Sequence, residues 1–269
     1  MLAAAVTTAP QAQQRQEVPA TVVPTLSDLF SHSPLGSCEQ QARAEQRLRV
    51  ATWNIKAARA ASLAEVAATI RAMDADVVAL QEVDVRTSRS GGVDQPTALA
   101  AALEFHYAFA ASIRWDGGDY GLAILSKWPF AAVERHRVGA TDRAEPRIVL
   151  DATICVAGRP LRILNHHADD EGVARALGFV DVRRIVQAVA GRGVLLVGDM
   201  NERAGGPGVR AVRDSGLVDL GAGADTSTSE GGRIDYLFAD DLLARHASAA
   251  RVWQTDKSDH HAVLADLRW

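Results

Sequence analysis

The sequence predicts an α/β (α+β) fold arranged as a four-layer sandwich, in which two packed mixed β-sheets are flanked by helices. Three observations lead to this fold class. Short β-branched runs recur after residue 47, few helical stretches lie among them, and 48% of the residues are hydrophobic. Near-continuously apolar strands need cover on both faces, and so many of them exceed a simple doubly wound sheet.

The predicted elements follow one another in a regular order. A helix over 62–73 begins with Ser62 and Glu65 at capping-box spacing, and a longer helix over 171–191 ends at Gly191. The predicted strands are 49–55, 76–83, 121–126, 147–156, 161–167, 193–199, 233–238 and 261–267.

The first part of the chain has a different composition. Residues 1–46 are rich in Ala, Pro, Gln and Ser without apolar alternation, so we expect a tail or linker there, with a short helix over 38–48. The start, MLAAAVTTAPQAQQ, has a short apolar patch and an A-x-A-like stretch but no basic residues before them. We expect a signal-peptide remnant of a secreted or periplasmic protein, with a disordered tail of a cytoplasmic protein as the alternative. One folded domain is predicted over 47–269.

Charge and cysteine content exclude several classes of protein. The net charge of −4 argues against a protein that wraps duplex DNA with a broad basic face, although a nuclease with few local contacts remains open. Two cysteines, Cys38 and Cys155, are too few for a disulfide framework or a zinc cage, and their pairing is left open. No run approaches the roughly 18 apolar residues of a membrane span, so no transmembrane segment is expected.

Polar residues gather at the ends of the predicted strands, where a rigid sheet commonly presents reactive groups. Each of them alone is explained by a turn, a helix cap or an edge charge. As a set at equivalent strand ends they indicate a site, and they are Asn54, Glu82, His167, Asp199, Asn201, Asp235, Asp259 and His260.

These residue types point to chemistry at phosphorus. Oxygen ligands such as Asn54, Glu82 and Asp259 suit Mg²⁺ or Mn²⁺. Imidazoles beside carboxylates supply general acid and base groups. Together the two sets predict metal-assisted displacement at a phosphoester.

The chain resembles the endonuclease/exonuclease/phosphatase superfamily from about Arg49 to Trp269. The resemblance rests on seven motifs in the expected order: TWNI, LQEVD, YGLAILSKWPF, NHH where the family usually has N-T-H, GDMN, RIDYLF and SDHHAV. It implies the four-layer fold and makes 47–269 a catalytic domain like that of bacterial metal-dependent hydrolases.

The resemblance also implies a role for each matching residue. Asn54, Glu82 and Asp259 correspond to the family's metal site, and Asp199 and Asn201 to the pair that orients the attacking water and contacts the phosphate. His260 corresponds to the phosphate-facing imidazole oriented by Asp235, and His167 to the second imidazole. The resemblance does not decide whether Asp199 or His260 takes the proton of the water.

Some positions depart from the family pattern or extend it. His166 replaces the usual Thr, which we expect to alter phosphate contacts, and Ala262 replaces a common Pro. Asn165, Arg89 and Arg147 are the predicted substrate-binding residues, with surface arginines as the alternative reading of Arg89 and Arg147.

The predicted function is a Mg²⁺- or Mn²⁺-dependent phosphoester hydrolase, first of all a phosphodiesterase, that is a monomer and acts on a small-molecule, lipid or nucleic-acid phosphoester. The alternatives are a nonspecific DNA or RNA nuclease, a lipid-headgroup or inositol-phosphate phosphatase, and a degenerate binding module without catalysis. The residues that give thin support for a nuclease are Arg86, Arg89, Arg114, Trp115 and Arg143. A degenerate module would have lost a metal ligand or a catalytic His, and none is missing.

Overall fold

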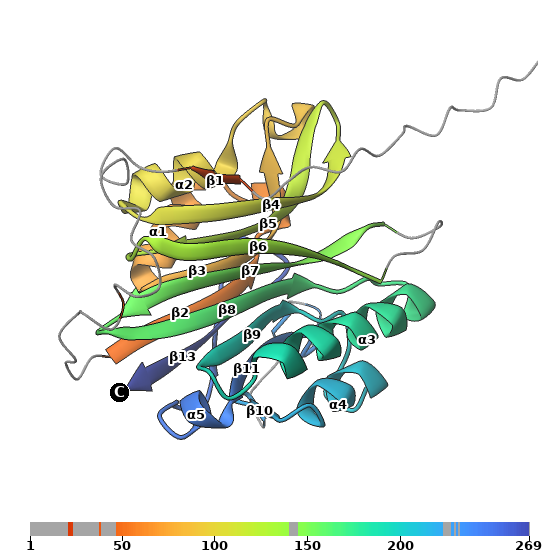
Figure 1. The fold of residues 1–269 in the computed structure, drawn as a ribbon. Helices are drawn as coiled ribbons and strands as arrows, with labels where there is room; N and C mark the ends of the chain where they lie inside the picture. The colour runs from red at the N-terminus through yellow and green to blue at the C-terminus, as the bar shows by residue number, and fades with distance from the viewer. Residues whose placement is uncertain are drawn as a thin grey trace, which may run out of the picture.

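The computed structural model describes residues 21–23, 38, 47–139, 145–222, 227–228, 230 and 232–268. Two mixed sheets pack face to face, as Figure 1 shows. The first has the strand order β1-β4-β5-β3-β2-β13-β12 and the second β10-β11-β9-β8-β7-β6. Only the β2–β3 and β8–β9 pairs are parallel among the described strands.

The first sheet contains β1 (Thr21–Val23), β2 (Arg47–Asn54), β3 (Val77–Val85), β4 (His106–Trp115), β5 (Gly118–Ser126), β12 (Arg251–Trp253) and β13 (Ala262–Arg268). The second contains β6 (Phe130–Val138), β7 (Arg147–Val156), β8 (Arg159–His167), β9 (Val194–Asp199), β10 (Leu217–Asp219) and β11 (Asp235–Asp240). The helices are α1 (Leu63–Met73), α2 (Gln95–Leu103), α3 (Gly172–Val189), α4 (Pro207–Arg213) and α5 (Asp241–Ala244), with 3-10 turns at Lys56–Ala58 and Ser88–Ser90.

Three apolar clusters separate four layers. The central cluster joins the inner faces of both sheets, for example Val50 of β2 with Val197 of β9. A second cluster packs α1 and α2 against the first sheet, and a third packs α3 and α4 against the second sheet. The four-layer sandwich is therefore confirmed. Among the described residues no helix is long and apolar enough to cross a membrane.

All of the predicted strands and the two longer predicted helices, over 62–73 and 171–191, are present. Ser62 caps α1, and the reciprocal bond from the Ser62 N–H to the Glu65 carboxylate completes the capping box. Strand β4 was not predicted because its run HYAFAASIRW is rich in Ala, a poor strand former. Strand β6 was not predicted because this edge strand is mostly half-exposed and carries polar side chains.

The N-terminal stretch is attached to the domain at two described points. Strand β1 pairs antiparallel with β4 at one edge of the first sheet. A disulfide joins Cys38 to Cys155 near the end of β7. The expected signal-peptide remnant and most of the expected helix over 38–48 lie outside the described residues, and 47–48 belong to β2.

Asn165 lies between the sheets and not in a substrate-binding position, which corrects the prediction. Its side chain is fully buried; its Nδ2 donates to the carbonyl oxygens of Leu80 and Ala123, both at 3.0 Å, and its Oδ1 accepts from Gln81 at 2.7 Å. All of its polar capacity is used to join the second sheet to the first. Strand alternation explains this placement, because Asn165 continues the inner-face row of Leu161 and Ile163.

His166 points to the other side of the same strand, so it cannot alter phosphate contacts as expected. Its ring is buried beneath α3 with its edge toward Phe179, and its Nδ1 lies 2.9 Å from the carbonyl oxygen of Ile148. Its Nε2 is buried without a partner. Burial lowers the pKa of His166 to about 4, so the folded protein holds this ring neutral.

Replacing Asn165 by Ala is expected to lower the free energy of unfolding by about 2–3 kcal/mol, because it removes three buried hydrogen bonds, one from Gln81 and two to carbonyl oxygens of the first sheet. Urea denaturation measures this, with the exposed Arg159→Ala on the same strand as the control. Unchanged stability together with weaker substrate binding would restore Asn165 as a substrate contact.

Acidification is expected to destabilise the protein through His166. The folded pKa of about 4 lies below the ordinary 6.5, so between these values only the unfolded chain binds the proton. Stability is complete above pH 6.5 and declines as the pH falls toward 4, by about 3 kcal/mol in all. Thermal unfolding of wild type and His166→Leu between pH 4 and 8 measures this: the variant should lose that part of the slope, whereas the exposed His246→Gln should keep it. An identical slope in wild type and His166→Leu contradicts the assignment.

Candidate active site

The inner faces of both sheets lead into one polar site at the strand ends. In β9 the core residues Leu195 and Val197 are followed, two residues on, by Asp199. The same alternation carries Asn54, His167 and Asp235 to the inner face of β2, β8 and β11. Four buried polar residues that are far apart in sequence therefore meet because each occupies the inner row of its strand.

A β-bulge, and not strand alternation, brings Glu82 to the site. The β3–β5 register shifts between Leu80 and Val83, and Glu82 has a left-handed φ of 56° at this irregularity. Regular alternation would place Glu82 on the helix-covered face with Leu80, but Val83 takes that place instead. The bulge re-aims the carboxylate, whose Oε1 accepts a hydrogen bond from Asn54 Nδ2 at 3.0 Å.

Asp199 is the centre of the constellation and is 1% exposed. Its Oδ1 accepts from the Asn201 N–H at 2.9 Å, and its Oδ2 accepts from Asn54 Nδ2 at 3.1 Å. The same Oδ2 lies 3.5 Å from His167 Nε2 and 3.6 Å from His260 Nε2. Burial and repulsion from Asp235 raise the pKa of Asp199 above its ordinary value.

His260 is held in its charged form. Its Nδ1 lies 2.9 Å from Asp235 Oδ2, and Asp235 is 1% exposed. Burial lowers the pKa of His260, but the hydrogen bond to Asp235 and the charges of Asp235, Asp199 and Asp259 outweigh it and raise the pKa to about 9. His260 is therefore an imidazolium at neutral pH.

His167 is held neutral on the other side of Asp199. Burial, together with the positive charges of Arg147 and His260, lowers the pKa of His167 well below its ordinary value. Asn201 Nδ2 lies 3.3 Å from its Nε2, and an Arg147 nitrogen lies 3.4 Å from its Nδ1. The two imidazoles beside Asp199 thus have opposite protonation states.

The predicted metal-site residues form an oxygen-rich edge of the same site. Asn54 bonds Glu82, and Asp259 Oδ2 accepts from the Lys56 ammonium at 2.5 Å. Both carboxylates raise the pKa of Lys56, with the hydrogen bond to Asp259 the larger cause. The carboxylates of Glu82 and Asp259 and the amide oxygen of Asn54 are the kinds of ligand that a hard divalent cation prefers.

Two functional-site residues were not found from the sequence. Lys56 lies in a 3-10 turn and was not recognisable, because its partner Asp259 is 203 residues away. Tyr120 lies between Arg89, whose guanidinium carbon is 5.3 Å from its ring centroid, and Arg147. The family motif YGLAILS was the available signal for Tyr120.

The two predicted substrate-binding arginines occupy different settings. Arg89 binds buried Asp84 with two nitrogens at 2.8 Å, so its side chain braces the wall of the site. Arg147 is 12% exposed, lies next to His167, and pairs with Glu145 at 3.1 Å and with Asp169 at 3.4 Å. His261, which was not assigned to the site, bonds the backbone of Thr255, outside the constellation.

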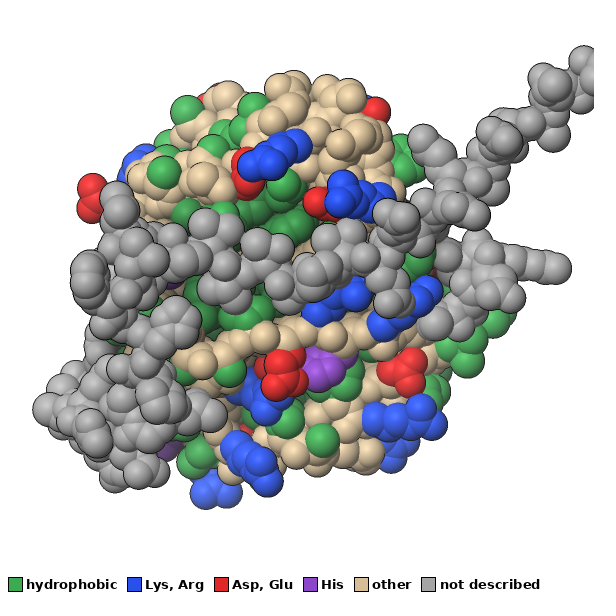
Figure 2. Space-filling view, turned by 45° about the horizontal axis from the view of Figure 1, so that its top comes forward, with side chains coloured by type: hydrophobic (Ala, Val, Ile, Leu, Met, Phe, Trp, Pro, Cys, Tyr) green, Lys and Arg blue, Asp and Glu red, His purple; other side chains and the backbone are tan. Residues whose placement is uncertain are grey.

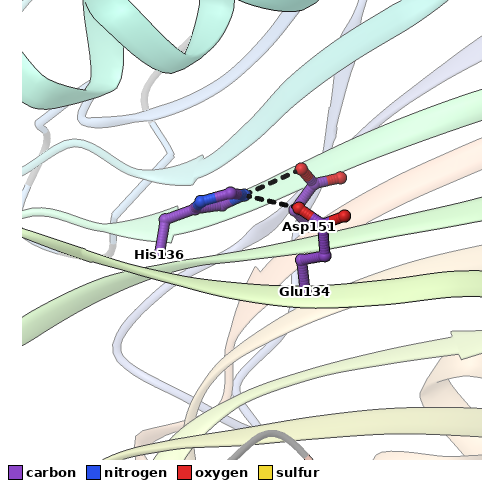
Figure 3. A group of neighbouring side chains, drawn as sticks. All are labelled: Glu134, His136 and Asp151. Atoms are coloured by element: carbon purple, nitrogen blue, oxygen red, sulfur yellow. Dashed lines mark hydrogen bonds and ion pairs between the residues drawn. The ribbon is translucent and has the colours of Figure 1, made fainter.

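A second group of His and carboxylate side chains lies on the second sheet, on β6 and β7 (Figure 3). His136 Nε2 is 3.0 Å from Asp151 and 3.6 Å from Glu134. Arg162 binds both oxygens of Asp151, so a guanidinium already occupies the position that a cation would need. This group is an ion-pair network on the sheet surface and not a candidate catalytic site.

Comparisons with known proteins identify the family of the chain. The family model described as "Endonuclease/Exonuclease/phosphatase family" matches residues 51–260, and the chain belongs to this family. No curated protein matches the chain.

Solved structures of the same family share the fold. An endonuclease/exonuclease/phosphatase from Beutenbergia cavernae has a TM-score of 0.69 at 23% identity, over 83% of this chain and 72% of that one. A mannosyl-6-phosphatase from Bacteroides thetaiotaomicron has a TM-score of 0.65 at 17% identity, over 81% of this chain and 98% of that one. A 3' phosphatase from Neisseria bound to a DNA hairpin has a TM-score of 0.66 at 18% identity, over 82% of this chain and 100% of that one. The family acts on phosphoesters, and the chain carries the architecture of a hydrolase.

Proposed function

We propose that the protein is a divalent-metal-dependent phosphodiesterase that hydrolyses its substrate by in-line attack of water on phosphorus. One observation carries the proposal: a buried carboxylate, Asp199, lies between an imidazolium and a neutral imidazole, beside an oxygen-only ligand set. This arrangement would provide a proton acceptor, a fixed positive charge and a cation site close together.

Glu82, Asp259 and Asn54 would hold Mg²⁺ or Mn²⁺. The bound ion supplies the positive charge that neutralises phosphoryl oxygens and permits an anionic substrate to be attacked. Asn54 has a second task, because its Nδ2 also orients Asp199. Lys56 forms an ion pair with Asp259, so its positive charge also offsets the negative charge of these ligands.

Asp199 is the better general base of the two candidates. The base must be unprotonated, and His260 is an imidazolium at neutral pH because Asp235 holds its proton. Asp199 combines an anionic oxygen with a raised pKa, which makes it a stronger proton acceptor than an ordinary carboxylate. His260 instead stabilises negative charge on the phosphoryl group, as a preorganised donor does.

His167 and Asn201 complete the phosphate contacts. Neutral His167 can accept or donate one hydrogen bond without adding charge, and Asn201 holds it while bonding the Ala168 carbonyl oxygen at 2.9 Å. Arg147 then positions His167 from the opposite nitrogen. These three side chains would orient the phosphate and would take no part in proton transfer.

The charge balance favours a phosphodiester over a phosphomonoester. Each cation at the site has a carboxylate partner: Lys56 has Asp259, Arg147 has Asp169 and His260 has Asp235. Little positive charge remains for a dianionic monoester beyond that of the metal. A phosphodiester carries one negative charge and needs less positive charge at the site, so it suits this charge balance better.

A nonspecific nuclease is less well supported. On the face shown in Figure 2, Lys and Arg side chains lie in small groups among acidic and uncharged ones and form no broad basic surface. Trp115 is 45% exposed, but Arg114 beside it is paired with Asp119. The DNA-bound Neisseria relative shows only the shared fold at 18% identity.

We also propose that the protein is exported. The Cys38–Cys155 disulfide supports this, because such bonds form and persist mainly in oxidising compartments.

Hydrolysis of bis(p-nitrophenyl) phosphate is expected to require Mg²⁺ or Mn²⁺ and to stop on addition of EDTA. His260→Ala should lower kcat by about 10²–10³, because it removes a preorganised positive donor. His261→Ala, which changes the neighbouring imidazole outside the site, is the matched control and should retain activity. Hydrolysis that survives both EDTA and His260→Ala contradicts the proposed site.

Replacing Asp235 by Asn is expected to move the alkaline limb of the kcat/KM profile to lower pH. The variant loses the carboxylate that raises the pKa of His260 to about 9, so the imidazolium loses its proton earlier as the pH rises. Proton NMR of the His260 ring measures the same pKa directly. An alkaline limb that stays in place in Asp235→Asn would show that the charged form of His260 is not required.

A further inference from the structure

A pocket of about 270 Å³ opens beside the phosphate-facing imidazole. Its wall consists of Arg203, Thr228, Glu230, Gly232, Ile234, Asp259 and His260. Whatever group is attached to a phosphate at His260 therefore has this pocket next to it. The pocket shares Asp259 and His260 with the site described above, and its other lining residues have no role assigned there.

Two charged side chains in this pocket are unpaired. The side chains of Arg203 and Glu230 are exposed, and neither forms a hydrogen bond or ion pair within the described part of the chain. This contrasts with Lys56, Arg147 and His260, which all have carboxylate partners. The unpaired charges are available for a ligand.

The lining excludes two kinds of occupant. Among the described residues that line the pocket none is aromatic, so these residues offer a nucleobase no stacking surface. Ile234 is the single aliphatic side chain of this described lining, so these residues offer an acyl chain no apolar slot. The volume also falls just below the roughly 300–1,000 Å³ usual for ligand pockets, which favours a small group.

The charges of Arg203 and Glu230 further limit which chemical group can occupy the pocket. Arg203 offers only donors and Glu230 only acceptors. A second phosphate would bond Arg203 but would be repelled by Glu230 and Asp259, and an ammonium group would bond Glu230 but would be repelled by Arg203. A hydroxyl group both accepts and donates, so neighbouring hydroxyls use both residues at once.

We propose that this pocket recognises a small polyhydroxylated group, a glycerol or monosaccharide unit, esterified to the phosphate that is hydrolysed. Arg203 donates to its hydroxyl oxygens and Glu230 accepts from its hydroxyl protons. Thr228 lies at the same wall but already bonds the backbone of Gly232, so it shapes the pocket. The proposal rests on the proposed function only for the phosphate position beside His260.

The test compares two phosphodiester substrates that share a p-nitrophenyl leaving group. One carries glycerol or a hexose on the other ester, and the reference, bis(p-nitrophenyl) phosphate, carries no hydroxyls. Arg203→Ala and Glu230→Gln should each lower the ratio of kcat/KM for the polyol diester to that for the reference about tenfold or more, mainly through KM. Arg213→Ala, an exposed arginine outside the pocket, is the matched control and should leave the ratio unchanged.

The outcomes separate the two proposals. An unchanged ratio in both pocket variants overturns the polyol subsite, as does faster wild-type cleavage of a DNA oligonucleotide than of the polyol diester. Absence of any metal-dependent hydrolysis overturns the proposed function instead. In that case calorimetric titration with glycerophosphoglycerol still tests the pocket: binding by wild type that Arg203→Ala weakens about tenfold supports it, and equal or absent binding in both overturns it.

Discussion

The hydrogen bond from Asn54 to Asp199 is the contact on which the site depends. It joins the end of β2 in one sheet to the end of β9 in the other, at 3.1 Å and out of contact with solvent. A buried carboxylate is costly unless it is paired. Asn54, the Asn201 N–H and the two imidazoles provide that pairing for Asp199, so the sandwich must close correctly before the site exists.

Below this contact a second buried polar link holds the sheets in register. Gln81 of β3 bonds Asn165 of β8, and Asn165 bonds the carbonyl oxygens of Leu80 and Ala123. Polar links of this kind fix one arrangement of two apolar faces that could otherwise slide past each other. The precise positions of Asn54 and Asp199 therefore rely on residues that do not themselves meet substrate.

Three residues whose side chains belong to the site have a strained backbone conformation. Glu82, Asn201 and Lys56 all have left-handed φ values, of 56°, 45° and 49°. Such conformations cost about 1–3 kcal/mol each in a residue other than glycine and persist only where surrounding structure imposes them. Gln95 illustrates that support, since its side chain bonds the Ala57 carbonyl oxygen and the Asp84 N–H and so ties the Lys56 turn to β3.

The sequence by itself determined where most strands form and which polar residues stand at their ends. The sequence predicts that Asn54, His167, Asp199 and Asp235 stand at the ends of apolar strands, and the capping pair of Ser62 and Glu65 predicts the start of α1. These features are local, because they depend on the spacing of residues within one element.

Only the tertiary structure decided what each of these residues does. It separated Asn165, His166 and His167, which are consecutive, into a link between sheets, a buried ring under α3 and a member of the site. It also joined Lys56 to Asp259 and Cys38 to Cys155, and it placed Arg203 beside Glu230. The protonation states also depend on the tertiary structure. Against the effect of burial, carboxylates from other strands raise the pKa of His260, whereas burial and nearby positive charges lower that of His167. Contacts between distant segments arise only when the chain closes, and no local pattern encodes them.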